Sequence, residues 1–232
     1  MTAAPTPRPP PESVADLITR ARALAGRSVS ELAADLGARV PPDQRRAKGF
    51  VGQLLERALG ATAGSSDRPD FEALGVELKT IPVDGTGRPR ESTFVCTIPM
   101  SEIAEVDWEQ SRVYRKLAHV LFVPIESAPD LPLGARRIGG PVEWRPDEAQ
   151  ERDLRADWDE LAGLVGRGDV ESVTAHLGRY LQVRPKAAHS RIRGRAPEAE
   201  GGWLETVPRG FYLRATFTEA ILRAALAPSM IT

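Results

Sequence analysis

The sequence predicts a mixed α/β fold, with strands flanked by helices. Three observations lead to this class: apolar residues recur at helical spacing over residues 14–24, strand-like segments follow from residue 73, and a helical pattern returns at 147–166. With 232 residues, 41% hydrophobic and 27% charged, the chain is long enough for a substantial core and is not of the disordered or fibrous class.

The first part of the chain reads as an arm followed by helices. Residues 1–12 are rich in proline, which indicates a flexible arm ahead of one folded domain over residues 13–232. Ser13 and Asp16 indicate a helix start, and the apolar spacing continues to Gly26. Similar patterns end at later glycines. Helices are therefore predicted over residues 14–24, 30–36 and 43–59.

Strand patterns dominate from residue 73 onward. Two of them flank a turn at residues 84–89, where glycine and proline are concentrated. The predicted strands are residues 73–81, 93–98, 117–125, 141–144 and 180–184, with a strand pair within 203–214. Further helices are predicted over residues 147–166, 169–176 and 218–226, and residues 189–202 are expected to form an exposed loop.

The composition excludes several classes of protein and site. Cys96 is the single cysteine, so neither a disulfide framework nor a cysteine-rich zinc site is expected. The three histidines, at positions 119, 176 and 189, lack metal-ligand spacing, so carboxylates would have to hold any metal. No apolar run approaches the roughly 18 residues of a membrane span, and the proline-rich start does not resemble a signal peptide. We therefore expect a cytoplasmic protein.

The formal net charge of −1 conceals an asymmetry along the chain. Residues 147–171 carry nine acidic and three basic side chains, whereas residues 184–223 carry eight basic and four acidic ones. This distribution is compatible with an ordinary solvated surface. It would also provide a cationic surface for a polyanion.

Asp70, Glu77 and Lys79 form the most informative pattern. On a strand, residues two apart share a face, so Glu77 and Lys79 should project together, and Asp70 can return its carboxylate beside them. Two converging carboxylates suit Mg²⁺, and a nearby lysine could orient or deprotonate an attacking water. Restriction-type nucleases carry this pattern. The alternative is a strand whose polar face carries an ordinary Glu/Lys pair.

Glu56 and Lys48 extend the pattern. Glu56 lies on the helix predicted before the loop, where many such nucleases place a third carboxylate, and Lys48 lies a little over two turns earlier on the same side. The alternative for Glu56 is a solvated helix residue paired with Arg57 or another neighbour.

Several ordered blocks resemble the MutH family of mismatch-repair endonucleases. They are KGFVGQLLE (48–56), AGS (63–65), DFEALGVELKTIPV (70–83), GRP (87–89), STFVC (92–96), RPKAA (184–188) and PRGFYL (208–213). The resemblance covers essentially the whole chain after residue 12. It implies a restriction-endonuclease-like fold whose two lobes form a DNA cleft. It also implies Mg²⁺-dependent nicking of the unmethylated strand, 5′ of the guanine in a hemimethylated GATC site, and activation by MutL with MutS and ATP upstream.

The resemblance also implies roles for individual residues. Asp70, Glu77 and Lys79 match the catalytic triad, Glu56 matches a further carboxylate on the metal side, and Lys48 matches a lysine near the active site. Asp70, Glu77 and Glu56 would then hold metal, and Lys79 would act on the nucleophilic water. The residues matching the DNA interface are Phe94, Arg184, Pro185, Lys186 and Tyr212, with Lys116 as a further candidate near the active site.

Two of these matches agree with simple physical chemistry, although only the resemblance favours base readout over the alternatives. An arginine such as Arg184 can donate two hydrogen bonds to guanine in the major groove, worth ~1–3 kcal/mol of discrimination. Tyr212 matches the residue that contacts adenine and senses methylation of its amino group. The alternatives are a phosphate contact for Arg184, without sequence information, and a half-buried strand aromatic for Tyr212.

Three other functions are alternatives to the nicking enzyme. A GATC restriction enzyme must cut both strands, usually by pairing two sites, whereas one site in 232 residues favours a monomer that nicks and awaits MutL. A DNA-binding module without cleavage would be expected to have lost Asp70, Glu77 or Lys79. A general phosphoesterase would not explain the segment around Arg184 or Tyr212.

Overall fold

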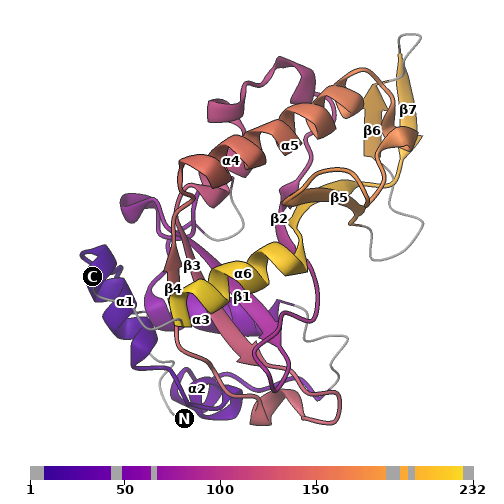
Figure 1. Cartoon of the computed structure of the whole chain (residues 1–232). Coiled ribbons are helices and arrows are strands. Elements are labelled where there is room, and N and C mark those ends of the chain that lie inside the picture. Colours follow the sequence, from indigo (N-terminus) through magenta and orange to yellow (C-terminus); the bar gives the residue numbers. More distant parts are fainter. Residues whose placement is uncertain (1–7, 43–48, 64–66, 187–193, 198–201, 227–232) are drawn as a thin grey trace. The chain divides into compact units, whose positions relative to one another are not determined.

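The computed structural model describes residues 8–42, 49–63, 67–186, 194–197 and 202–226. The chain divides into two compact units. The first comprises Met1–Glu91, His119–Arg145 and Ile221–Thr232, and the second comprises Ser92–Ala118 and Pro146–Ala220. Both contain helices and strands, which confirms the predicted α/β class (Figure 1). Within the described residues the strands form separate small sheets instead of one.

The first unit has a mixed three-stranded sheet within its described part. In the order β1-β3-β4, β1 runs parallel to β3, and β4 is antiparallel to β3. The strands are β1 (Glu77–Val83), β3 (Val120–Glu126) and β4 (Val142–Trp144). The helices are α1 (Val14–Arg22), α2 (Val29–Asp35) and α3 (Phe50–Leu59), with 3-10 turns η1 (Glu72–Leu74) and η4 (Leu133–Ala135).

The helices of this unit begin and end where the sequence signals lie. The Ser13 side chain accepts the N–H of Asp16 at the start of α1, and Ser28 and Glu31 form a capping box on α2. Apolar faces of the three helices pack with β1 and β3 in one core. Its members include Leu17, Leu32, Leu54, Leu59, Leu78 and Leu121. The sheet that carries the predicted catalytic residues therefore rests on a helical layer.

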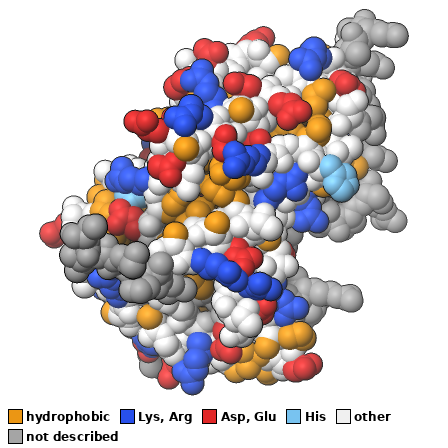
Figure 2. Space-filling model, viewed as in Figure 1, with side chains coloured by type: hydrophobic (Ala, Val, Ile, Leu, Met, Phe, Trp, Pro, Cys, Tyr) orange, Lys and Arg blue, Asp and Glu red, His pale blue; other side chains and the backbone are white. Residues whose placement is uncertain are grey.

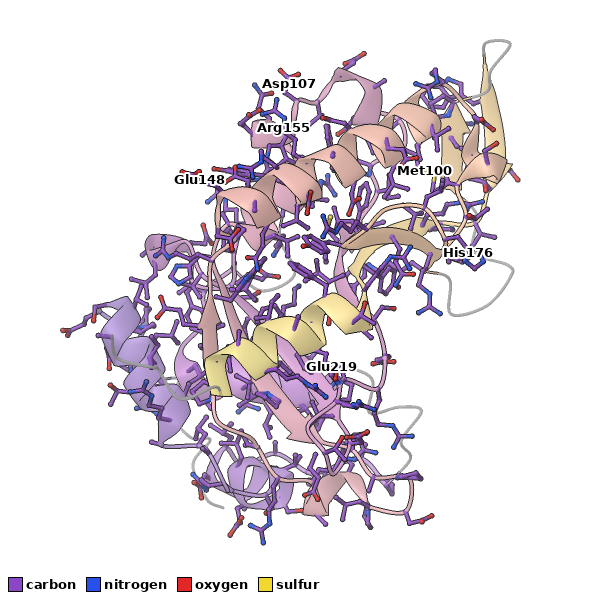
Figure 3. The ribbon with its side chains drawn as sticks, in the orientation of Figure 1. Met100, Asp107, Glu148, Arg155, His176 and Glu219 are labelled. Carbon is purple, nitrogen blue, oxygen red and sulfur yellow. The ribbon has the colours of Figure 1, made fainter. Side chains whose placement is uncertain are left out.

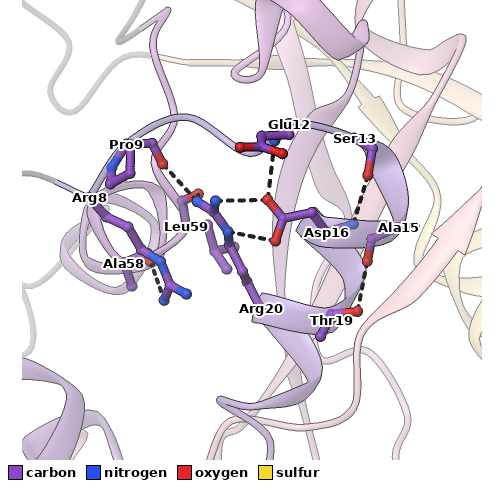
Figure 4. Close-up of polar contacts among 10 residues, drawn as sticks. All are labelled: Arg8, Pro9, Glu12, Ser13, Ala15, Asp16, Thr19, Arg20, Ala58 and Leu59. Atoms are coloured by element: carbon purple, nitrogen blue, oxygen red, sulfur yellow. Dashed lines mark hydrogen bonds and ion pairs between the residues drawn. The ribbon is translucent and has the colours of Figure 1, made fainter.

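The end of the proline-rich arm contacts two helices of the first unit, α1 and α3 (Figure 4). The Arg20 guanidinium donates to the carbonyl of Pro9 at 2.7 Å and binds Asp16 at the same distance. Arg8 donates to the carbonyl of Ala58 at 3.3 Å. These contacts join the arm to α1 and α3. Residues 1–7 lie outside the described range, so flexibility of the arm stays a prediction.

The second unit contains an antiparallel sheet in the order β2-β8-β5 and a hairpin of β6 with β7. Its strands are β2 (Thr93–Thr97), β5 (Leu181–Pro185), β6 (Gly194–Pro197), β7 (Trp203–Thr206) and β8 (Arg209–Leu213). Its helices are α4 (Arg112–Leu117) and α5 (Glu148–Gly166), with 3-10 turns η2 (Ile103–Glu105), η3 (Trp108–Gln110) and η5 (Val170–Ser172). Helix α6 (Ala215–Leu226) follows β8.

Helix α5 explains the acidic stretch. Its apolar residues Leu154, Leu161 and Val165 are buried. Glu148 and Arg155 lie on its exposed side (Figure 3), where Arg155 binds Glu109 at 2.8 Å. Charged side chains of both signs are interspersed over the face drawn in Figure 2. The acids of this helix are therefore largely a solvated face.

Several predicted boundaries were wrong. Strand β1 begins at residue 77 instead of 73, because residues 72–74 form a 3-10 turn that ends at Gly75 with a φ of 66°. The strand predicted over residues 117–125 begins only at Val120, because residues 112–117 form helix α4, which the sequence did not predict. The predicted helix at 169–176 is only a 3-10 turn.

The predicted pairing of strands also needs correction. Strands β7 and β8 do not form the expected pair, because β7 pairs with β6 and β8 with β2 and β5. Residues 194–197 are a strand within the expected loop, whose residues 189–193 and 198–201 lie outside the described range. No helix in the described part of the chain is long and apolar enough to cross a membrane.

Candidate functional site

A tight loop brings Asp70 back to the start of β1. Phe71 and Val76 form a β-bridge around η1, with the N–H of Phe71 donating to the carbonyl of Val76 at 2.9 Å. Gly75 allows this reversal through its positive φ. The carboxylate of Asp70 accepts the backbone N–H of Leu78 at 2.8 Å and is buried. The predicted return of Asp70 to the strand is therefore confirmed.

Glu77 and Lys79 project from one face of β1, as predicted. Lys79 Nζ lies 2.7 Å from Glu77 Oε1, and both side chains are largely shielded from water. The neighbouring Leu78 faces the opposite way, into the core. The backbone N–H of Glu77 donates to the carbonyl of His119 at 2.9 Å, which anchors the start of β1 to the residue before β3. The structure thus places two carboxylates and an ammonium at one end of β1.

Two further predicted site residues that the structure describes lie on helices α3 and α4. Glu56 is half-buried on α3, and this helix packs against β1. Lys116 is buried on α4 and belongs to the second unit, whereas Glu56 and Asp70 belong to the first. Lys48 lies outside the described residues. Their participation stays a prediction.

The donor set at β1 fits a hard divalent cation. In the described part of the chain, no group of three or more His, Cys, Asp or Glu side chains is placed to hold a metal. Mg²⁺ requires fewer protein ligands, because it binds one or two carboxylates and keeps water and substrate phosphate as its other ligands. Asp70 and Glu77 supply that number of carboxylates. A tetrahedral zinc site would need more nitrogen or sulfur ligands.

His119, whose carbonyl anchors the start of β1, has a buried imidazole that the sequence did not single out. Its Nε2 lies 2.9 Å from Glu143 Oε1, and its Nδ1 is buried without a hydrogen-bond partner among the described residues. Burial is the main cause that lowers the pKa of His119; Arg145 lowers it further, and the bond to Glu143 opposes this. The lowered pKa favours the neutral imidazole at pH 7, and because a carboxylate oxygen accepts, the hydrogen is assigned to Nε2. The sequence signal for the burial of His119 is its position directly before the apolar run 120–125.

A second cluster lies on one face of the β2-β8-β5 sheet. Phe94 and Tyr212 are Cα partners across β2 and β8, and their rings meet edge to face with centroids 5.3 Å apart. The opposite face of this sheet is apolar and buried. It includes Val183, Phe211 and Leu213. This sheet therefore has one packed face and one aromatic face.

Two cations lie over these rings. The guanidinium carbon of Arg184 is 5.8 Å from the centroid of Tyr212, and Lys186 Nζ is 4.2 Å from that of Phe94. Pro185 lies between the two cations at the end of β5. The structure thus brings together all the residues matched to the DNA interface except Lys116. The positive charge and aromatic surface suit a nucleic acid.

Asp157 holds the turn that leads into β5. Its buried carboxylate accepts the backbone N–H groups of Arg179, Tyr180 and Leu181 at 2.6, 2.6 and 2.8 Å. From the sequence, Asp157 is one of the nine acids of residues 147–171 that fit a solvated surface. The available signal was its place on the apolar stripe of α5, between Leu154 and Leu161.

A cavity of about 580 Å³ lies elsewhere in the first unit. Its lining includes Thr80, Arg90 and Arg136, but none of the predicted catalytic or DNA-binding residues that the structure describes. Thr80, which follows Lys79 on β1, lines this cavity. The cavity adds nothing to the site at β1.

Comparison with known proteins identifies close relatives. Residues 59–157 match the family model described as DNA mismatch repair enzyme MutH. A DNA mismatch repair protein MutH of Klebsiella pneumoniae is 52% identical over 213 residues, 92% of each chain. The protein of the same name from Escherichia coli is 49% identical over 219 residues, 93% of this chain and 96% of the relative. One from Salmonella paratyphi C is 51% identical over 213 residues.

Proposed function

The chain belongs to the MutH family of DNA mismatch repair enzymes, and we propose that it is the endonuclease that nicks the unmethylated strand at GATC sites during methyl-directed mismatch repair. Its sites are hemimethylated or unmethylated GATC. The observation that carries this proposal is about 50% identity over more than 90% of the chain. The juxtaposition of Asp70, Glu77 and Lys79 at the start of β1 supports it.

The acidic residues would hold the metal and the lysine would act on water. Asp70 and Glu77 are the proposed Mg²⁺ ligands, with Glu56 as a further carboxylate on the metal side. When bound, Mg²⁺ polarises the scissile phosphate and lowers the pKa of the attacking water. Lys79, held 2.7 Å from Glu77, would orient that water and stabilise negative charge that develops on the phosphate. By the resemblance, Lys48 and Lys116 would lie near this active site.

The aromatic face of the second unit would read the DNA sequence. Arg184 would donate to guanine, and Tyr212 would contact adenine, where a methyl on the amino group removes one donor and adds bulk. Phe94, Pro185 and Lys186 would complete this surface. The contacts that support the proposal are those between the two rings and the two cations.

The resemblance also implies partners and an arrangement. We propose that the protein acts as a cytoplasmic monomer, that MutL activates it with MutS and ATP upstream, and that its two lobes receive duplex DNA in a cleft. A restriction enzyme that cuts both strands is the second candidate, but the relatives are named as mismatch repair proteins. A reader of GATC without cleavage is disfavoured because Asp70, Glu77 and Lys79 are all present.

Plasmid nicking tests the proposal. Supercoiled plasmids with unmethylated, hemimethylated or fully methylated GATC are incubated with the protein and Mg²⁺ at low salt, with and without MutL and ATP. We expect nicking of the first two plasmids, sparing of the third and stimulation by MutL. Double-strand cutting without MutL would assign a restriction enzyme instead. Binding to GATC without any cutting would assign a reader.

A further inference from the structure

The two cations of the aromatic face, Arg184 and Lys186, are held by hydroxyl groups at the two ends of β2, the strand on the far side of β8. Arg184 Nη1 donates to Ser92 Oγ at 2.7 Å, and Lys186 Nζ donates to Thr97 Oγ1 at 2.6 Å. Thr97 ends β2, and Ser92 precedes its first residue. Arg184 and Lys186 belong to β5 and the residue after it, so each side chain reaches across the central strand β8 to its hydroxyl.

Gly210, on the central strand β8, leaves room for the ring of Phe94 beneath these side chains. It is the Cα partner of both Thr97 and Arg184 on β8. A Cβ at this position would lie 2.9 Å from Cε2 of Phe94 and 3.0 Å from the carbonyl oxygen of Cys96. With hydrogen there instead, the ring of Phe94 lies close against β8. Lys186 can then contact the ring and Thr97 at the same time.

We propose that Ser92 and Thr97 are specificity-determining positioning residues, which hold Arg184 and Lys186 in place before DNA binds. This inference rests on the proposed function of the aromatic face in reading GATC. The hydroxyls contact the cations and not the reacting phosphate, so they act through Arg184 and Lys186. Their role is to fix the direction from which each cation meets the DNA.

The physical reason is conformational entropy. Lysine and arginine side chains have many rotamers, and ordering one at an interface weakens binding. Arg184 and Lys186 are exposed, but a hydroxyl and a ring face already restrict each of them. Removing a hydroxyl should therefore weaken recognition of the correct site about two- to tenfold. A mobile cation can still contact phosphates, so binding to unrelated DNA should change less.

Thr97 allows the sharper test. Thr97→Val replaces the hydroxyl with a methyl group and retains the β-branched shape, whereas Thr97→Ser restores a hydroxyl. Ser92→Ala is the equivalent change under Arg184. Matched controls are Thr216→Val and Ser101→Ala, at exposed positions of the same unit. Thermal unfolding of every variant shows whether the fold is retained.

Two measurements are made on each variant. Fluorescence anisotropy with Ca²⁺ in place of Mg²⁺ compares affinity for a hemimethylated GATC duplex with affinity for a duplex of scrambled sequence. Nicking with Mg²⁺ and MutL then separates kcat from KM. We expect Thr97→Val and Ser92→Ala to lower the ratio of GATC affinity to scrambled-DNA affinity about two- to tenfold. KM should rise by a similar factor of about two to ten, while kcat stays unchanged. In Thr97→Ser, both the affinity ratio and KM should return toward the wild-type values.

A double-mutant cycle shows whether Thr97 acts through Lys186. In a Lys186→Met background, Thr97→Val should have no further effect on the affinity ratio. The inference is overturned if Thr97→Val and Ser92→Ala match the wild type, if they lower kcat alone, or if the effect of Thr97→Val persists without Lys186. Failure of the wild type to nick GATC would overturn the proposed function instead. The affinity ratios would still decide the role of the hydroxyls.

Discussion

Lys79 Nζ and Glu77 Oε1 lie 2.7 Å apart at the start of β1, where the two side chains are only 13% and 4% exposed. Charges so shielded depend on each other, because removing one leaves the other buried without its partner. A neutral substitution at either position therefore alters both the chemistry and the stability of the site. Experiments on this pair must measure the two effects separately.

Neutral variants of the pair should lose nicking and retain DNA binding. Glu77→Gln removes a carboxylate proposed to bind the metal. Lys79→Met removes the ammonium group proposed to orient the attacking water. We expect the rate of plasmid nicking to fall on the order of a thousandfold in each. Anisotropy with a GATC duplex in EDTA, together with urea unfolding, measures binding and stability.

Glu72→Gln is the matched control, because Glu72 forms an exposed pair with Arg68 in the same loop. This variant should retain wild-type nicking. Nicking that survives in both Glu77→Gln and Lys79→Met would remove them from the catalytic machinery. Loss of nicking together with loss of folding would leave only a structural role for the pair.

The sequence predicted this arrangement because it is local. Glu77 and Lys79 share a face through the two-residue period of a strand, and Asp70 returns through a loop that closes within eight residues. The N-terminal helices were predictable for the same reason, since caps such as Ser13 and Ser28 lie beside the helices that they begin.

The sheet pairings were not predictable from local pattern. The strands on either side of residues 84–89 looked like neighbours, yet β1 and β2 belong to different sheets. Phe94 pairs with Tyr212, more than a hundred residues along the chain, and no local signal encodes that partner. The structural role of Asp157 was not predicted, because its hydrogen-bond donors are backbone N–H groups, which no side-chain motif reveals.

Tyr212 provides a test of methylation sensing. Tyr212→Phe retains the ring that meets Phe94 edge to face and removes only the hydroxyl, whereas Tyr212→Ala removes both. If the hydroxyl senses the adenine amino group, Tyr212→Phe should reduce the ratio of nicking on hemimethylated to fully methylated DNA by about tenfold. An unchanged ratio in both variants would make Tyr212 a packing residue.

Gly210→Ala should disturb the aromatic face. The added Cβ would lie 2.9 Å from the Phe94 ring and 3.0 Å from a backbone carbonyl, so the ring or the strand must move. Overpacking of this kind costs about 1–3 kcal/mol of the free energy of unfolding, measurable with urea. Gly140→Ala is the control, because its Cβ would meet no atom within 4 Å. Equal stability of the two variants would show that the ring of Phe94 yields without cost.

Acid should destabilise the first unit through His119. Its pKa is lowered in the fold, mainly by burial, whereas the unfolded chain takes up the proton near the ordinary value of 6.5. The unfolded state therefore binds more protons between these two pKa values. Stability is complete above about pH 6.5, falls as the pH drops below it, and levels off below the folded-state pKa.

Urea unfolding of the metal-free protein at about pH 7.5 and about pH 5.5 measures this effect. In His119→Gln, which keeps a donor for Glu143, the loss of stability between the two pH values should be smaller than in the wild type. Equal losses would assign the pH dependence to other groups.

Asp157→Asn should destabilise the turn before β5. The amide keeps one oxygen for the three N–H groups of Arg179, Tyr180 and Leu181 and turns its own N–H₂ toward them. Buried donors without acceptors cost about 1–3 kcal/mol each, so we expect the free energy of unfolding to fall by about 2–4 kcal/mol in urea. Asp159→Asn, at an exposed position on the same helix, should change it by less than about 0.5 kcal/mol.

Because this turn begins the strand that carries Arg184, the affinity ratio for GATC over scrambled DNA should fall as well in Asp157→Asn. A large loss of stability with an unchanged ratio would show that β5 keeps its register without the turn.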